Sequence, residues 1–482
     1  MLDVRPAIHV IGLLTAILGA AMLLPMGADM IDGSGHWPIF LEAAILTTLI
    51  GLCAGLATAN ASRDRLSLQQ TFLLTVGVWV ALPVFAAIPF ILGATGASVT
   101  DAVFEAMSGL TTTGSTVFSG LDDLPAGILL WRGLLQWFGG VGVIVMAMVF
   151  LPELRVGGMQ IFRSEAFDTM GKVLPRAAEI SAQISTIYVG ITVACAMAYG
   201  AAGMEGFDAI VHAMTTVATG GFANTDASFG AYKGDIEYIA TGFMLLAGLP
   251  FVLYVRLANG EARPLWRDPQ VRAFLGTYGV LVLLAGGAVV IGTGAGFEPA
   301  LREAAFNVAS ILTGTGYASA DYMLWGGFAV GLFFFLGLIG GCAGSTSCSV
   351  KVFRYQILFA AARARLRSIH SPHGVFRPRY DGRVVGPDVL GSVMAFFTMF
   401  FVSLGFFAVA LAMTGLDFVT SVSGAATALA NIGPGLGATI GPTGNFAPLS
   451  DPAKWILIAA MLIGRLELMA VFVLFTRRFW IA

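Results

Sequence analysis

The chain has 482 residues, of which 57% are hydrophobic and only 11% are charged, and its formal net charge at pH 7 is −2. Soluble domains carry about 25% charged residues, so this composition excludes an ordinary soluble enzyme, a secreted scaffold and a disordered chain. The near-neutral charge also argues against nucleic acid as a partner. The four cysteines form no CxxC pair and lie in or near apolar runs, which indicates reduced core residues. We therefore expect an all-α polytopic membrane protein.

The N-terminus begins with an apolar run that is not a cleavable signal. Residues 7–30 are an apolar stretch of about two dozen residues, long enough to cross about 30 Å of hydrocarbon. Nine further spans are expected near 37–58, 70–93, 126–150, 181–203, 235–257, 273–294, 325–349, 389–413 and 454–476. An even number of spans, ten, places both termini on the same side of the membrane.

The distribution of Lys and Arg predicts which side that is. With a cytoplasmic N-terminus, 21 of the 26 Lys and Arg fall in inner segments. Outer segments hold four, Arg132, Lys233, Arg302 and Lys454, and Arg465 lies inside a span. This bias satisfies the positive-inside rule, so we predict cytoplasmic termini. The longest inner stretch, 351–388, is either a docking surface for a soluble partner or a solvated helix end that faces anionic lipid.

An internal repeat lies between the spans. Three segments begin with an acid followed by alanine, continue with apolar residues at helical spacing and reach a glycine 13 residues later. They run from Asp101 to Gly114, from Asp208 to Gly221 and from Glu303 to Gly316. A fourth segment, from Asp417 to Gly433, is about three residues longer. Self-similarity of this kind indicates a repeat architecture.

The repeat predicts two leading helices and four pseudo-symmetric copies of helix, pore segment and helix. The expected units are 1–60 for the leading helices, 66–155, 178–258, 270–352 and 389–482 for the four pore repeats, and 353–388 for a cytoplasmic linker. Short pore helices are expected at 101–110, 208–217, 303–312 and 417–429. The four stretches that follow these helices, which we call the filter segments, are 112–115, 219–222, 315–317 and 431–433.

The filter segments have the chemistry of a cation path. An acid suits a helix N-terminus, and the other end of the helix carries about half a negative charge, so four such ends around one axis favour a cation. Backbone carbonyls can replace the water shell of a monovalent cation, and glycine lets the backbone adopt the required φ. The expected ion-binding residues are Thr112, Thr113, Gly114, Thr219, Gly220, Gly221, Thr315, Gly316, Asn431, Ile432 and Gly433. No ring of carboxylates lies there, which argues against a divalent-cation site.

Ordinary packing turns are the alternative interpretation of these segments. Small-residue packing between helices explains much of the count of 61 glycines. It does not explain an acid-to-glycine spacing that is kept three times.

Several motifs together resemble the TrkH family, the membrane subunits of bacterial Trk potassium uptake systems. They are the Thr-Thr-Thr-Gly, Thr-Gly-Gly-Phe and Thr-Gly-Tyr filter segments, the stretch Asn-Ile-Gly-Pro-Gly-Leu-Gly that follows them, and the motifs at 136–142, 340–346 and 464–467. The resemblance covers essentially the whole chain. It implies a potassium-channel-like pore in each protomer of a homodimer in the bacterial inner membrane, with the potassium ion as substrate and no cofactor on this chain. It further implies a cytosolic, nucleotide-binding regulatory ring of the TrkA type.

The resemblance also implies potassium selectivity and a gate. In related plant and yeast transporters, serine at the first filter glycine accompanies sodium permeation, and here that position is Gly114. The eighth span is interrupted, which suits a hinged intramembrane loop or a close helix–helix contact. The expected gate residues are Gly340, Gly341, Cys342, Ala343, Gly344, Ser345, Thr346 and Arg465. Cys348 and Ser349 stand where the family usually continues with two glycines, which is expected to reduce the flexibility of the loop.

Charged residues near this interruption have two interpretations each. A charge at the depth of Arg465 costs about 2.5–3.5 kcal/mol on insertion scales, so it is either a cationic barrier or part of a buried pair. Glu467 is two residues away and does not face it on a helix. Lys351 and Arg354 are expected at the cytoplasmic interface, where they either couple to the partner ring or snorkel.

A secondary transporter and a membrane-embedded enzyme are the two alternatives to a pore. A sodium-permeable or cation-coupled secondary transporter with the same fold stays an alternative, although inverted halves are more typical of such transporters than four copies with one topology. The sequence has no HExxH, GxSxG or Walker motif, so we expect a transport protein and not an enzyme.

Overall fold

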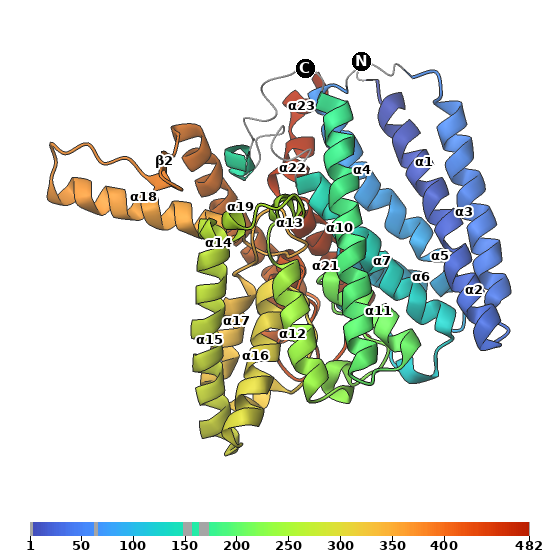
Figure 1. Cartoon of the computed structure of the whole chain (residues 1–482). Helices are drawn as coiled ribbons and strands as arrows, with labels where there is room; N and C mark the ends of the chain where they lie inside the picture. The colour runs from blue at the N-terminus through green and yellow to red at the C-terminus, as the bar shows by residue number, and fades with distance from the viewer. Residues whose placement is uncertain (1–2, 62–65, 148–156, 163–172, 482) are drawn as a thin grey trace.

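The computed structural model describes residues 3–61, 66–147, 157–162 and 173–481, and most of its regular secondary structure is helical (Figure 1). Among the described residues one short hairpin forms, in which β1 (Arg379–Tyr380) pairs antiparallel with β2 (Arg383–Val384). Both chain ends lie on the same face of the molecule. Arg63, Arg65, Arg155, Arg163 and Lys172, which the sequence assigns to inner segments, lie outside the described residues.

Three leading helices lie at one edge: α1 (Arg5–Ala21), α2 (Leu23–Asp32) and α3 (Trp37–Ala57). Helices α1 and α3 pack closely because glycines line their contact. A Cβ on Gly12 would come within 2.7 Å of the Gly55 nitrogen and 2.8 Å of the Gly51 oxygen. Small residues of this kind let two backbones approach in a membrane, where the hydrophobic effect does not drive helices together.

The remaining helices form four successive units. The first contains α4 (Leu68–Ala86), α5 (Ile88–Leu92), α6 (Val99–Leu110), η1 (Leu121–Asp123) and α7 (Ala126–Val145). The stretch that follows holds η3 (Met159–Phe162). The second unit contains α10 (Val173–Ala201), α11 (Gly206–Val217), η4 (Ser228–Ala231), α12 (Asp235–Ala247) and α13 (Phe251–Ala258).

The third unit contains α14 (Arg263–Arg267), α15 (Pro269–Thr293), α16 (Phe297–Thr313), η5 (Tyr322–Trp325), α17 (Gly327–Gly337) and α18 (Val352–His370). The fourth contains α19 (Pro387–Ala412), α20 (Phe418–Ala430), α21 (Asp451–Arg465), α22 (Met469–Phe472), η6 (Val473–Phe475) and α23 (Arg477–Ile481). In each unit one helix, α6, α11, α16 or α20, precedes a predicted filter segment and follows a longer span.

The described residues contain seven helices that are long and apolar enough to cross a membrane, or up to nine spans if each of two bent pairs counts as one. This makes a multi-pass membrane protein, but three of the ten predicted spans are not straight helices. The pair α12 and α13 bends by 93°, and the pair formed by α21 and residues 469–475 bends by 104°. The predicted span 325–349 holds only the 11-residue helix α17.

The breaks have local causes. Pro250 follows Gly248 and Leu249 at the first bend and cannot donate a backbone hydrogen bond to continue a helix. At the second bend, Glu467 and Leu468 have φ values of 61° and 39°, which no right-handed helix contains.

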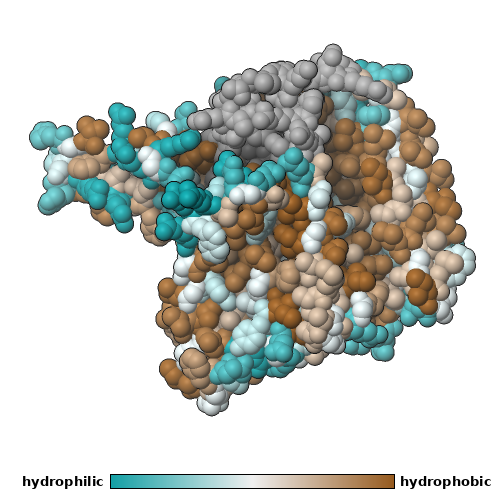
Figure 2. Space-filling view, in the orientation of Figure 1, coloured by the Kyte–Doolittle hydropathy of each residue, from teal (hydrophilic) through white to brown (hydrophobic). Residues whose placement is uncertain are grey.

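The surface is divided as expected for a membrane protein. Hydrophobic side chains cover most of the helical body, and hydrophilic ones gather along its lower edge and on α18 and its hairpin, which project from the body (Figure 2). Arg363, Arg365 and Arg367 are exposed on this projecting helix. The stretch 351–388 therefore forms a basic arm that projects sideways from the helical body (Figure 1).

Candidate ion pore

Each predicted filter segment follows one of the short helices α6, α11, α16 and α20. The predicted start of the first three pore helices is late, because α6, α11 and α16 begin at Val99, Gly206 and Phe297. The acids Asp101 and Asp208 therefore lie three residues after the N-cap and do not cap their helices.

The fourth copy differs in the place of its acid and not in the length of its helix. Asp417 is the N-cap of α20, and its carboxylate accepts hydrogen bonds from the backbone N–H of Val419 and Thr420 at 3.0 and 3.1 Å. A hydrogen bond from the Thr420 side chain, together with these backbone bonds, holds the pKa of this exposed carboxyl below its usual value. Both α6 and α11 have 12 residues, whereas α20 has 13 and α16 has 17. The longer spacing seen in the sequence thus reflects an acid that stands three positions earlier.

All four helices end in the same hydrogen-bonded cap. Two consecutive residues at the end of the helix fold back. The N–H of the first donates to the carbonyl three residues earlier, and the N–H of the second donates to the carbonyl five residues earlier. In the first copy these are Thr112 N–H to Gly109 O, at 2.9 Å, and Thr113 N–H to Ser108 O, at 2.8 Å. The matching bonds begin at Thr219 and Gly220, at Gly314 and Thr315, and at Asn431 and Ile432. This is the Schellman arrangement, which needs a left-handed residue just after the helix.

Left-handed backbone recurs twice in each filter segment. The cap residues Thr112, Thr219, Gly314 and Asn431 have φ values of 51°, 50°, 76° and 51°. Two residues further on, Gly114, Gly221, Gly316 and Gly433 have φ values of 82°, 78°, 88° and 108°. We call these last four the glycine ring. The same backbone geometry is therefore repeated four times, although the side chains differ.

The glycine ring is closed by contacts between successive filter segments. A Cβ on Gly114 would overlap the carbonyl oxygen of Gly220, and one on Gly221 would overlap that of Thr315. A Cβ on Gly316 would overlap the oxygen of Ile432, and one on Gly433 would lie 2.9 Å from the oxygen of Thr113. Each glycine thus meets the carbonyl that precedes the next glycine, and the fourth segment returns to the first. Only glycine permits this approach, because any side chain would displace the neighbouring carbonyl.

An outer cavity of about 270 Å³ lies against the ring and is lined by all four of its glycines. Two of its lining residues are charged, Arg132 and Asp226. Asp226 accepts hydrogen bonds from the N–H groups of Gly120 and Leu121 at 2.7 and 3.2 Å. Because the lining contains no set of carboxylates, the oxygens available to a cation at the ring are neutral, which suits a monovalent ion better than a divalent one.

A second set of fourfold contacts supports the filter segments from behind. At the same turn of the first three pore helices, a buried polar side chain faces the backbone N–H that lies 12 residues later. Glu105 accepts from Val117 at 3.0 Å, His212 from Asn224 at 3.4 Å and Asn307 from Ser319 at 3.3 Å. These contacts fix the strand that leaves each filter segment. Glu105 and Asn307 are not among the residues predicted from the sequence, although both lie nine residues before a ring glycine, which is a usable signal.

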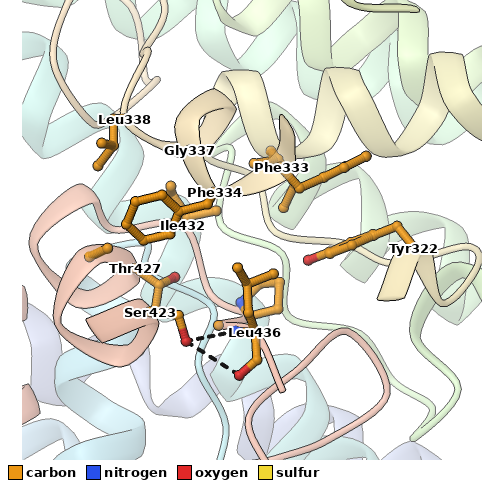
Figure 3. Close-up of a pocket in the computed structure, with 13 residues that line it drawn as sticks. Tyr322, Phe333, Phe334, Gly337, Leu338, Ser423, Thr427, Ile432 and Leu436 are labelled. Atoms are coloured by element: carbon orange, nitrogen blue, oxygen red, sulfur yellow. Dashed lines mark hydrogen bonds between the residues drawn. The ribbon is translucent and has the colours of Figure 1, made fainter. Parts of the chain in front are cut away.

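In the fourth copy, a neighbouring residue holds the strand that leaves the filter segment. Gly424 stands at the matching position, and Ser423 instead accepts from the Leu436 N–H at 2.9 Å and donates to the Leu436 carbonyl at 3.3 Å (Figure 3). A small cavity of about 30 Å³ lies beside this contact, between Ile432 and the aromatic rings of Tyr322 and Phe333 (Figure 3).

Arg132 and Gln136 on α7 join the first unit to the second. The Arg132 guanidinium donates to Glu105 at 2.9 Å and to the carbonyl of Ala223 at 2.8 Å. Gln136 donates to the carbonyl of Gly220 at 2.5 Å and accepts from the Phe222 N–H at 3.0 Å. The outer segment residue Arg132 is thus not solvated but buried as part of the scaffold.

The pair Glu105–Arg132 is expected to be important for stability, because both side chains are almost fully buried, at 0% and 1% exposure. Removing one partner leaves an unpaired buried charge, which costs about 3–5 kcal/mol. We expect Glu105→Gln and Arg132→Gln each to lower the thermal unfolding midpoint in detergent strongly, and the double variant to lose less than the sum. The exposed pair Asp3–Arg5 is the control, and Asp3→Asn should have little effect. Additive losses in the double variant would contradict the pairing.

Residues 338–351, which we call the gate loop, lie against the filter segments where the pore helices end. The Ser347 hydroxyl donates to the carbonyl of Thr313 at 2.5 Å, and the Cys348 sulfur lies 3.6 Å from the Thr112 hydroxyl. A cavity of only about 30 Å³ remains there, lined by Asn431, Cys348 and Arg465 among others. The space on this side of the ring is therefore largely filled by the loop.

The gate loop and the bend between α12 and α13 satisfy each other's backbone groups. The Cys342 N–H donates to the carbonyl of Gly248 at 3.0 Å, and the Phe251 N–H donates to the carbonyl of Gly344 at 2.9 Å. Breaks at membrane depth leave polar groups that must be satisfied inside the protein. The two breaks thus depend on each other, and the loop is sequestered away from lipid.

Arg465 lies beside the gate loop at the end of α21. One terminal nitrogen contacts the Cys348 sulfur, and the other donates to the carbonyl of Gly139 at 3.3 Å. Its Nε is buried and has no partner among the described residues. The guanidinium carbon lies 5.7 Å from the centroid of the Trp79 ring. Arg465 is not paired with Glu467.

Glu467 instead forms a buried ion pair with Arg354, whose Nε donates to the carbonyl of Gly157 at 2.9 Å. Arg354 also lies 3.8 Å over the ring of Phe396. Lys351 and Arg354 are buried, at 8% and 0% exposure, so neither side chain snorkels to the surface. Contacts with residues more than 100 positions away account for the burial of Arg354, whereas Lys351 donates to the carbonyl of Ser347, four residues earlier.

Comparisons with known proteins agree with this architecture. The family model TrkH, described as "Cation transport protein", matches residues 37–480. The chain is 44% identical over 479 residues to the Trk system potassium uptake protein TrkI of Halomonas elongata, covering 98% of this chain and 96% of that one. It is 36% identical over 484 residues to the Trk system potassium uptake protein TrkH of Escherichia coli K12, covering 99% of each. The crystal structure of the potassium transporter TrkH from Vibrio parahaemolyticus superposes with a TM-score of 0.91, at 34% identity, over 99% of this chain and 100% of that one.

Proposed function

The chain belongs to the TrkH family of cation transport proteins, and from that membership and the geometry above we propose that it takes up potassium through the glycine ring, gated by the loop 338–351. In this proposal the membrane is the bacterial inner membrane, and both termini and the basic arm α18 face the cytoplasm. It is a transporter and not an enzyme.

The observation that supports the pore most strongly is the closed order of the four ring contacts. Equivalent backbone positions from the four filter segments meet in a closed order. The first segment contacts the second, the second the third, the third the fourth and the fourth the first. Packing turns between helices have no reason to form such a cycle. A cycle of equivalent carbonyls around one axis is what coordination of a dehydrated monovalent cation requires.

Potassium is favoured over sodium by two arguments. Glycine occupies all four ring positions, so no side chain narrows or polarises the ring. The relatives that match nearly the whole chain are named as potassium uptake proteins. A sodium-permeable or cation-coupled transporter with the same fold is the second candidate function.

Gating follows from the way the gate loop is held. The loop contacts Thr112 and Thr313 beneath the ring, and Arg465 contacts both the loop residue Cys348 and the neighbouring helix α7 at Gly139. In this proposal the loop and the Arg465 charge obstruct the path until the loop moves toward the bend at Gly248. Residues 340–346 and Arg465 form the gate.

Partners are proposed from the surface and the family. The exposed arginines of α18 lie on the arm that projects sideways from the body (Figure 1). A cytosolic, nucleotide-binding ring of the TrkA type would dock on this arm and pull on α18, which is continuous with the gate loop. Two protomers would form a homodimer, each with its own pore.

Uptake into liposomes tests the proposal. The purified chain is reconstituted, and uptake of rubidium is measured in the presence of potassium, sodium, lithium or N-methylglucamine. We expect saturable uptake that potassium blocks and sodium does not. Equal permeation of sodium would support the pore but would refute its selectivity for potassium. If wild-type protein carries no flux, a variant with a shortened loop 341–347 decides whether the gate is shut or no pore exists.

A further inference from the structure

An apolar chamber separate from the ion path lies among the helices α1, α4 and α7. Its volume is about 470 Å³, and Ile17, Val78, Leu82 and Phe138 are among the residues that line it. Pockets of about 300–1,000 Å³ hold small-molecule ligands. None of the functions described above uses this chamber.

The chamber offers few polar groups to water. Of its lining side chains, only those of Thr75, Trp79 and Ser185 carry a polar group, and the Thr75 hydroxyl already donates to the carbonyl of Thr71 at 2.8 Å. A buried water needs two to four polar partners, and apolar cavities of about 150 Å³ stay dry. The occupant must therefore be apolar.

The position of the chamber identifies the source of that occupant. Its walls come from the apolar spans Arg5–Asp32, Leu68–Leu92 and Ala126–Val145, at positions within these spans. The lining residue Ile17 is 63% exposed, and a recessed hydrophobic surface is visible between α10 and α4 (Figure 2). A chamber at this depth that opens sideways faces the lipid hydrocarbon directly. We propose that it binds an acyl chain of a membrane phospholipid.

The inner wall of the chamber connects it with the proposed gate. Trp79 and Gly139 both line it, and these are the residues that contact Arg465, through the indole ring at 5.7 Å and through the carbonyl at 3.3 Å. Leu110, the last residue of α6, also lines it. An acyl chain in the chamber therefore supports the wall on which the Arg465 guanidinium rests, and its loss alters the gate. This second part rests on the proposed function, whereas binding does not.

Filling the chamber tests both parts. Gly142 lines it, and a Cβ there would meet only the Trp79 ring, at 3.8 Å, so Gly142→Leu adds bulk inside the chamber without a backbone clash. Gly276→Leu is the matched control, because Gly276 lies on the exposed surface of α15 and nothing lies within 4 Å of its Cβ position. Val78→Phe is a second filling variant from the opposite wall, in case Gly142→Leu does not fold.

Binding is measured by photolabelling of the full chain in phospholipid vesicles. A phospholipid with a diazirine in its acyl chain is used in one arm, and a free fatty acid with the same group in another. We expect phospholipid adducts on chamber residues of α1, α4 and α7 that fall at least about fivefold in Gly142→Leu, the change that corresponds to about 1 kcal/mol, and that persist in Gly276→Leu. Adducts confined to the outer surface and equal in all variants would overturn the proposal. Labelling by the fatty acid alone would overturn the phospholipid as occupant.

The link to the gate is measured on the same vesicles. We expect the rubidium flux of Gly142→Leu to change at least about twofold relative to Gly276→Leu, with unchanged ion selectivity. Loss of labelling with unchanged flux would overturn the coupling. If neither the wild-type protein nor the variant with the shortened loop 341–347 carried rubidium, the pore itself would be refuted. The labelling result would stand independently.

Discussion

Gly114→Ser is expected to reduce the preference for potassium over sodium by about tenfold or more, a change of about 1.4 kcal/mol in discrimination. Gly114 has a φ of 82°, and a side chain in this left-handed region costs about 1–2 kcal/mol. Its Cβ would also overlap the carbonyl oxygen of Gly220 in the next filter segment. The substitution therefore moves a carbonyl that the proposal assigns to the ion.

The measurement is rubidium uptake into liposomes with sodium as competitor, together with direct sodium uptake. Gly276→Ser on the exposed face of α15 is the matched control, because its Cβ position is unobstructed. Gly433→Ser should have a smaller effect than Gly114→Ser, since its Cβ would lie 2.9 Å from the Thr113 oxygen and not overlap it. Unchanged selectivity in a folded Gly114→Ser protein would refute the assignment of the filter.

Arg465→Ala is expected to raise the basal flux, in the absence of any partner, by about tenfold or more. A unit charge acting on an ion about 10 Å away is worth about 1.7 kcal/mol at an effective dielectric constant of about 20, which is more than tenfold in rate. The substitution also removes the contacts that join the gate loop at Cys348 to α7 at Gly139. Both effects favour passage of cations.

Two further variants separate the charge from the contact. Arg465→Lys keeps the charge and should stay close to wild type, whereas Cys348→Ala keeps the charge and loses the contact with the gate loop, so its flux should rise less than that of Arg465→Ala. Rubidium uptake at matched protein content is the measurement, and thermal unfolding verifies that each variant is folded. A flux that falls or stays level in folded Arg465→Ala protein would show that Arg465 is not a barrier.

Of the two breaks in the gate region, only the one at 340–347 could be predicted from the sequence. The interruption at 340–347 was predictable, because a cluster of small and hydroxylated residues within a span weakens helix formation locally. The bend at 466–468 was not, since Leu468 and Glu467 are ordinary helix formers. Their left-handed backbone is maintained by tertiary contacts, including the pair of Glu467 with Arg354 from a segment 113 residues away.

The charged residues likewise divide into those whose burial could be predicted from the sequence and those whose burial depends on tertiary contacts. Hydropathy predicted that Arg465 lies within a span, but Lys351 and Arg354 also proved buried. Glu467, from a distant segment, offsets the cost of removing the Arg354 charge from water, and Lys351 donates to the carbonyl of Ser347, four residues earlier. Arg132 appeared to be an outer-segment charge and instead joins the first unit to the second through Glu105 and Ala223. Counting charges along the sequence predicts an orientation but cannot show which charges have partners.

The sequence by itself determined the membrane class, the four repeated pore segments and the positions of their ring glycines. These features are local: hydropathy is summed over one span, and a positive φ favours glycine at a single position. Only the tertiary structure decided that the four glycines close into a cycle, that Arg132 joins Glu105 to Ala223, and that Arg465 touches both Cys348 and Gly139. Those contacts join residues that are in part more than 100 positions apart, and their geometry depends on how whole helices pack, which no local pattern encodes.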